Sequence, residues 1–144
     1  MATPGQIQEV AKHFVIAAIW ADSEEGTNPR ACTQTHRVAF GICKAFIDAN
    51  LALFNRAMEC SDNGYGSHPD AGSAEASFGH DLWLTSQGHG TGFWDRDELG
   101  DDLGKALTAA LEQFSKTVNI DHEQYRGWFY IRAWDKVNQI NLYV

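Results

Sequence analysis

Cysteine and basic residues are scarce in this sequence, and each shortage excludes a class of protein. There are 3 cysteines, without the close spacing of a zinc site or a redox pair, so we expect free thiols in a reducing compartment. Acidic residues number 19 against 11 basic ones, which gives a formal charge of -8. Nucleic-acid phosphates repel such a chain, so nucleic-acid binding is not expected. Imitation of a phosphate backbone stays open as an alternative.

Long apolar runs are also missing. No window reaches the length of about 18 apolar residues that a membrane span needs. The first residues show no basic region followed by an apolar run and a cleavage site. We therefore expect no membrane association and place the chain in the cytosol. The sequence does have ample core material, with 44% hydrophobic and 12% aromatic residues in 144, which predicts a single domain over residues 1–144.

Apolar residues recur at helical spacing in three segments, residues 6–20, 35–59 and 98–115. Phe14–Trp20 could instead form a strand, because short apolar runs do not separate the two structures. The second segment is apolar over most of its circumference, so we expect it to be the central helix. Residues 61–79 are rich in Gly, Ser, Ala and Asp and follow neither period, which predicts a mobile surface loop.

Two further segments alternate as strands do, residues 80–96 around a Gly-His-Gly turn and residues 128–144 around a polar turn. They predict an α+β fold with one antiparallel sheet of two β-hairpins, about four strands, packed with about three helices. In the first hairpin Asp81 would face Arg96 as a cross-strand ion pair. In the second, Ala133 would pair with Ile140, Ile131 with Leu142 and Phe129 with Val144.

The first hairpin concentrates the polar side chains that carry chemistry. A shared metal ion would need His80 and His89 together, but in a hairpin they are separated by several residues at about 3.3 Å each, so no metal or other cofactor is expected. An imidazole at position 89 is not explained by turn chemistry, which favours Gly, Asn or Asp. A purely structural role for the turn and the ion pair stays open. The candidate binding residues are His80, Asp81, Thr85, His89, Asp95 and Arg96.

The last hairpin presents a second candidate surface on one side of its strands. Aromatic rings interleaved with arginine can stack bases, but the negative charge of the chain argues against that use. The surface could instead pack under another layer, since three helices suffice to cover both faces of the sheet, or form a homo-oligomer. Its residues are Trp128, Tyr130, Arg132, Trp134 and Tyr143.

Residues 79–96 have the sequence GHDLWLTSQGHGTGFWDR. This resembles the hallmark GHDxWLTxxGHGxGFWDR of a family of small proteins encoded by tailed bacteriophages and prophages. A weaker likeness covers Ala18–Ala21 with the acids that follow, Leu99–Leu103 and Asn141–Val144. The resemblance implies a phage accessory protein that acts in the host bacterial cytosol by stoichiometric binding to a host or phage protein, in host takeover or anti-defence. It implies no catalytic residue.

Two classes of function are therefore carried forward. The first is a protein-binding modulator. The alternative is a small hydrolytic or ligand-modifying enzyme, metal-dependent or not, centred on residues 80–96. The enzyme is the less favoured class, because no Ser or Cys stands in a strand-turn-helix elbow and the glycines at 88–92 do not open a helix as a phosphate loop does.

Overall fold

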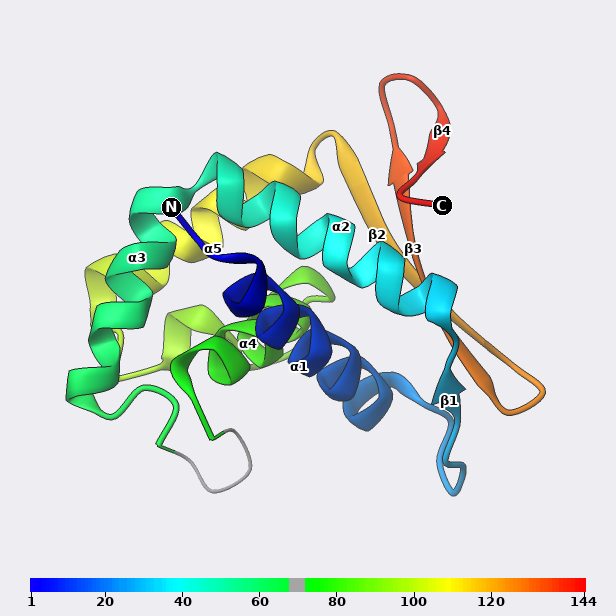
Figure 1. Ribbon diagram of the computed structural model, residues 1–144, viewed down its shortest axis with the longest axis horizontal. Coiled ribbons are helices and arrows are strands. Elements are labelled where there is room, and N and C mark those ends of the chain that lie inside the picture. The colour runs from blue at the N-terminus through cyan, green and yellow to red at the C-terminus, as the bar shows by residue number, and fades with distance from the viewer. Residues whose placement is uncertain (68–71) are drawn as a thin grey trace.

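The computed structural model describes residues 1–67 and 72–144 and shows an α+β fold (Figure 1). A four-stranded mixed sheet forms one side of these described parts, and the helices lie together on the other side. The helices are α1 (Pro4–Asp22), α2 (Thr33–Ala49), α3 (Leu51–Glu59), α4 (Ala74–Ser86) and α5 (Asp101–Ser115), with the short 3₁₀ helices η1 (Cys60–Asn63) and η2 (Phe93–Asp95). The strands are β1 (Arg30–Ala31), β2 (Val118–Tyr125), β3 (Trp128–Asp135) and β4 (Ile140–Leu142).

Helix α1 confirms the helix expected at residues 6–20, and the strand alternative for Phe14–Trp20 is wrong. Pro4 stands at the first helical position, where its missing N–H costs nothing. The Thr3 hydroxyl accepts a hydrogen bond from the Gln6 backbone N–H at 3.1 Å, and the Gln6 side chain accepts from the Thr3 backbone N–H at 3.0 Å. This reciprocal capping box fixes the start of the helix.

The single helix expected at residues 35–59 is in fact two helices, α2 and α3, that meet at 96°. Asn50 lies at the break with φ -133° and ψ 40°, outside the helical region. Its side-chain Nδ2 donates to the Phe46 carbonyl at 3.0 Å and so satisfies a carbonyl at the end of α2. The apolar residues that suggested one central helix are divided between two helices, and each helix buries its own apolar face.

Helix α5 confirms the helix expected at residues 98–115, although it begins three residues later, at Asp101. Gly100 precedes it with a φ of 82°, a conformation that helical residues do not adopt, so the helix cannot start earlier. Asp101 and Asp102 then lie in the first turn, where the positive end of the helix dipole favours carboxylates.

The largest correction concerns residues 80–96, which do not form a β-hairpin. Residues 80–86 belong to helix α4, and the chain then turns back through a loop that contains η2. The Ser73 hydroxyl caps α4 by accepting from the Ala76 backbone N–H at 3.0 Å. Most residues of α4 are buried on every side, so the helix has no polar face and its sequence carries no helical period. Strand-like alternation of Leu82 and Leu84 was therefore misleading.

The loop expected at residues 61–79 is only partly a loop. Its first residues form the end of η1, and residues 74–79 are the first turns of α4. Residues 68–71 lie outside the described residues.

The sheet contains one of the two expected hairpins. Strands β3 and β4 pair antiparallel, but Ala133 lies opposite Leu142 instead of Ile140. A shift of two residues leaves every side chain on its expected face, so the burial pattern survives the error in register. Strand β1 pairs in parallel with the other end of the same β3 edge, which makes the sheet mixed instead of purely antiparallel.

Strand β2, which was not expected, pairs with β3 over its whole length, from Val118 opposite Asp135 to Tyr125 opposite Trp128. The two strands are joined by Arg126 and Gly127, which have φ values of 51° and 81°. Two successive positive φ angles are the geometry of a tight two-residue hairpin turn. Asn-Gly is the usual sequence for it, and Arg-Gly gives a weaker signal.

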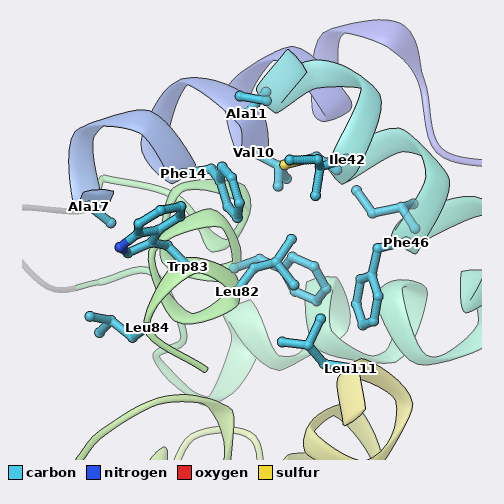
Figure 2. Packing of buried hydrophobic residues seen from close by; sticks show 14 of the residues in the cluster. Val10, Ala11, Phe14, Ala17, Ile42, Phe46, Leu82, Trp83, Leu84 and Leu111 are labelled. Carbon is cyan, nitrogen blue, oxygen red and sulfur yellow. The ribbon is translucent and has the colours of Figure 1, made fainter. Parts of the chain in front are cut away.

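The hydrophobic core lies mainly between the helices, and it reaches the inner face of the sheet through Phe129, Ile131 and Ala133. Figure 2 shows Phe14 of α1 beside Trp83 of α4, whose rings make an edge-to-face contact with centroids 5.2 Å apart. Helices α1 and α4 approach closely because Gly79 has no side chain, and a Cβ there would lie 2.1 Å from the Val10 carbonyl oxygen. All three cysteines are free, as expected.

Within residues 1–67 and 72–144, no single helix combines the length and apolar character needed to cross a membrane. Helix α2 and the segment formed by α3 and η1, which meet at a bend, reach that length and apolar character only when they are taken together.

Candidate functional site

Asp81 and Arg96 do pair, although the hairpin that suggested the pair does not exist. The Arg96 guanidinium donates to Asp81 Oδ1 through Nη2 at 2.7 Å and Nε at 2.8 Å. The Tyr65 hydroxyl donates to the other carboxylate oxygen at 2.8 Å. Helix α4 positions Asp81, and the returning loop brings Arg96 back beside it. The cluster thus fastens three separate segments of chain together.

Asp81 is only 1% exposed, and this burial has the largest effect on the pKa of its carboxyl group. Burial raises the pKa of Asp81, and the hydrogen bond and charge of Arg96 oppose that rise. Burial and the adjacent Asp81 also raise the pKa of Tyr65 well above its usual value. Every polar atom of the carboxylate is engaged by the protein itself, so this pair serves the fold and offers nothing to a ligand.

Thr85 and Asp95 likewise position the loop after α4. The Thr85 hydroxyl accepts from the Phe93 backbone N–H at 3.2 Å. The Asp95 carboxylate accepts from the Thr91 hydroxyl at 2.9 Å and from the Gly92 backbone N–H at 3.0 Å. Burial by itself would raise the pKa of Asp95, but these hydrogen bonds outweigh it, so the pKa is lowered. The two residues hold the backbone that carries Trp94.

The side chain of His89 contacts Asp22 at the end of α1. This contact explains why a histidine stands at a position where turn chemistry alone would favour Gly, Asn or Asp. Its Nε2 lies 3.0 and 3.1 Å from the two carboxylate oxygens of Asp22. The Trp83 indole N–H donates to the same carboxylate at 2.6 Å, and His122 Nε2 lies 3.9 Å away. We call these four residues the Asp22 cluster. A carboxylate at the negative end of a helix is disfavoured, and these donors offset that cost.

Three members of the Asp22 cluster, Asp22, Trp83 and His122, were not among the residues expected to form a site. The His122 ring stacks on Phe129 with centroids 5.6 Å apart and planes at 9°, so β2 and β3 hold it in place. The acids that follow Ala18–Ala21 belong to the phage-family likeness and were the one sequence signal for Asp22. Nothing in the sequence pointed to His122.

His80 does not join His89. It lies on α4, where its ring is 5.4 Å from the exposed ring of Trp20. Among the residues that the structure describes, no three His, Cys, Asp or Glu side chains are arranged to hold a metal ion.

A groove of about 530 Å³ runs beside the Asp22 cluster. The end of α4, the loop after it, helix α5 and the β3–β4 turn together form its walls. The residues that line it include Thr85, His89, Trp94, Glu112, Lys116 and Lys136. His89 thus contacts Asp22 through Nε2 and also lines the groove.

The outer face of the sheet carries the second candidate surface, with one correction. Alternate residues of β3 point away from the helices and are partly or fully exposed, namely Trp128, Tyr130, Arg132 and Trp134. Tyr143 is not among them, because its ring packs against Gly41 of α2, where an added Cβ would lie 2.3 Å from Cγ. In the described parts, the helices lie on the opposite side, so a helical layer over both faces was the wrong expectation (Figure 1).

Arginine side chains lie over the aromatic rings of this outer sheet face. The Arg30 guanidinium carbon is 4.9 Å from the Trp128 ring centre, and that of Arg132 is 5.4 Å from the Tyr130 ring centre. Arg132 also forms an ion pair with Glu123 of β2. Each such contact places a cation over the face of an aromatic ring.

No protein-family model, curated protein or solved structure matches the chain.

Proposed function

We propose that this chain is a phage-type accessory protein that acts in the bacterial cytosol by stoichiometric binding of a host or phage protein. The observation that supports it is the outer sheet face, where Trp, Tyr and Arg side chains stand in a row and no helix of the described residues covers them. Aromatic residues and arginine are the types that dominate binding energy at protein interfaces. Trp134 is 38% exposed, and Tyr125 of β2, which lies opposite Trp128 at the other end of β3, is 56% exposed. Such exposure of large aromatic side chains is costly for a surface without a partner.

The charges of the face indicate the chemistry of the partner. Three guanidinium groups lie on it, those of Arg30, Arg126 and Arg132, each over an aromatic ring. Two carboxylates, Asp121 and Glu123, lie on the same side of β2. Cations therefore outnumber anions on this face of a chain whose total charge is -8. An apolar partner surface that also presents carboxylates fits it best.

A single-stranded nucleic acid is the competing occupant, because stacked aromatics and arginine also bind bases. Asp121 and Glu123 on the face and the negative charge of the whole chain oppose a phosphate backbone. We therefore favour a protein, and the experiment separates the two.

The test is affinity capture from nuclease-treated bacterial lysate with wild-type protein and a Trp134→Ala/Arg132→Ala variant. Both side chains point to solvent, so the variant should keep its fold and its melting temperature within a few degrees. We expect recovery of the wild-type partner to fall at least about tenfold, since it loses a central aromatic and a cation. Quantitative mass spectrometry of the captured proteins measures the effect.

The matched control is Trp20→Ala/Arg37→Ala, which removes the same residue types from exposed positions of α1 and α2. It should capture the partner as the wild type does. Equal capture by all three proteins would refute docking on the outer sheet face. Loss of capture on nuclease treatment alone, with Trp134-dependent binding of single-stranded oligonucleotides, would establish the nucleic-acid alternative instead.

The second candidate function, a small hydrolytic or ligand-modifying enzyme, is favoured by one observation. Asp22 holds the His89 imidazole at 3.0 Å beside a groove, and a carboxylate that orients an imidazole is the arrangement of a general base. This candidate predicts hydrolysis of 4-nitrophenyl acetate or phosphate above the buffer rate, with loss of that activity in His89→Gln. Equal rates for the two proteins would eliminate it.

A further inference from the structure

The groove beside the Asp22 cluster has the volume of a small-molecule site. Its volume of about 530 Å³ lies within the range of about 300–1,000 Å³ that is usual for ligand pockets. Its walls come from four segments of chain that the fold has already fixed, including the hydrogen-bonded loop after α4. We propose that this groove binds a small phosphorylated ligand with a planar ring, the chemistry of a nucleoside monophosphate. This site is separate from the outer sheet face and shares no residue with it.

The phosphate would lie against two lysines. Lys116 and Lys136 both line the groove, one from the end of α5 and one from the β3–β4 turn. Lys136 Nζ donates to the Ser115 carbonyl at 2.8 Å, and Lys116 Nζ donates to the Gln113 side chain at 3.2 Å. An ammonium group has three donors, so each lysine is positioned by the protein and keeps donors for an anion. The groove is lined by two lysines and one carboxylate, that of Glu112, so in a chain of charge -8 it carries a local excess of positive charge, which attracts anions.

The planar ring would stack on Trp94. This indole lines the groove and is 49% exposed, while its neighbour Phe93 is completely buried. The backbone just before it is fixed by two hydrogen bonds, from the Gly92 N–H to the Asp95 carboxylate and from the Phe93 N–H to the Thr85 hydroxyl. An exposed indole on a fixed backbone offers a flat apolar surface at little cost in entropy, and stacking of a base on such a ring contributes about 1–3 kcal/mol.

Polar side chains between these two ends match the sugar. Glu112 and Thr108 also line the groove, about one and two helical turns before Lys116 along α5, and a carboxylate with a hydroxyl suits the hydroxyl groups of a ribose. His89 adds an imidazole whose position is set by Asp22. A purely anionic ligand would be repelled by Glu112, which favours a ligand with both a phosphate and hydroxyl groups.

The proposal is tested by isothermal titration calorimetry with the four ribonucleoside 5′-monophosphates, the corresponding nucleosides, D-ribose 5-phosphate and inorganic phosphate. We expect at least one monophosphate to bind the wild type with a Kd below roughly 1 mM, and at least about tenfold more tightly than its nucleoside or D-ribose 5-phosphate. Lys116→Gln/Lys136→Gln should weaken that binding at least about tenfold. Trp94→Ser should weaken the monophosphate about tenfold and leave D-ribose 5-phosphate unchanged.

Lys105→Gln and Trp20→Ser are the controls, because each removes the same residue type from an exposed position outside the groove. Both should bind as the wild type does. The proposal is overturned if no monophosphate gives saturable binding to the wild type, if inorganic phosphate binds equally well, or if the groove variants bind unchanged. None of these outcomes affects capture of a protein on the outer sheet face, so the two proposals fail separately.

Discussion

Arg96→Ala is expected to lower the free energy of unfolding by about 3 kcal/mol at neutral pH. The substitution leaves the Asp81 carboxylate, which is 1% exposed, without the guanidinium that compensates its charge. Among the side chains that the structure describes, only that of Tyr65 still donates to it. Loss of one partner of a buried pair is costly because the other charge stays desolvated. Urea unfolding followed by tryptophan fluorescence measures the change.

The loss of stability should depend on pH in a direction that identifies its cause. Without Arg96, nothing but the Tyr65 hydrogen bond opposes the effect of burial, so the pKa of Asp81 rises further above its ordinary value of 3.8. Between that value and the raised one, the folded chain holds a proton that the unfolded chain has released, so stability falls as pH rises. The melting temperatures of variant and wild type should therefore differ little near about pH 4 and diverge towards about pH 7.

A second substitution provides the control. Asp81→Asn in the Arg96→Ala background removes the buried charge and keeps an acceptor for Tyr65, so it should restore part of the stability and abolish the divergence with pH. Tyr65→Phe, which removes one hydrogen bond and no charge, should cost about 1 kcal/mol. If Arg96→Ala unfolds with the pH profile of the wild type and Asp81→Asn restores nothing, the ion pair does not stabilise the fold as described.

Gly79→Ala is expected to destabilise the protein by about 3 kcal/mol, the upper end of the cost of overpacking. The added methyl group would lie 2.1 Å from the Val10 carbonyl oxygen and 3.0 Å from the Phe14 backbone nitrogen. Both are backbone atoms of α1, so no side chain can move aside and the two helices must separate. Separation would also weaken the contact of Phe14 with Trp83. Thermal and urea unfolding measure the loss.

Gly90→Ala is the matched control, because a Cβ at Gly90 would meet no atom within 4 Å. It should change stability by no more than about 0.5 kcal/mol. Equal stability of the two variants would mean that α1 and α4 do not approach as closely as the structure shows.

Elements with a strong period could be predicted from the sequence. Helix α5 has one apolar face and one polar face, and the buried residues of α1 recur at helical spacing, so both helices were found. The β3–β4 hairpin was also found, with a two-residue error in register that leaves the alternation of faces unchanged. Helix α4 could not be found in this way, because burial on every side removes the period that would reveal it.

The candidate site shows a different limit. The pairing of Asp81 with Arg96 was predicted for the wrong reason, since a hairpin and a helix with a returning loop both bring the ends of this sixteen-residue segment together. The partner of His89 could not be predicted, because Asp22 lies 67 residues away in the chain. Contacts at that separation depend on how helices pack, which local patterns do not encode.

The long sequence separation between Asp22 and its partners also affects how the chain folds during synthesis. The hydrogen bond from Trp83 to Asp22 spans 61 residues, whereas β2 and β3 are joined by a two-residue turn and can pair at once. At translation speeds of about 5–20 residues per second, α1 leaves the ribosome on the order of 3–12 seconds before α4 exists to cover it. For that interval the face of α1 that packs on α4, with Phe14, is open to chaperones and to other nascent chains.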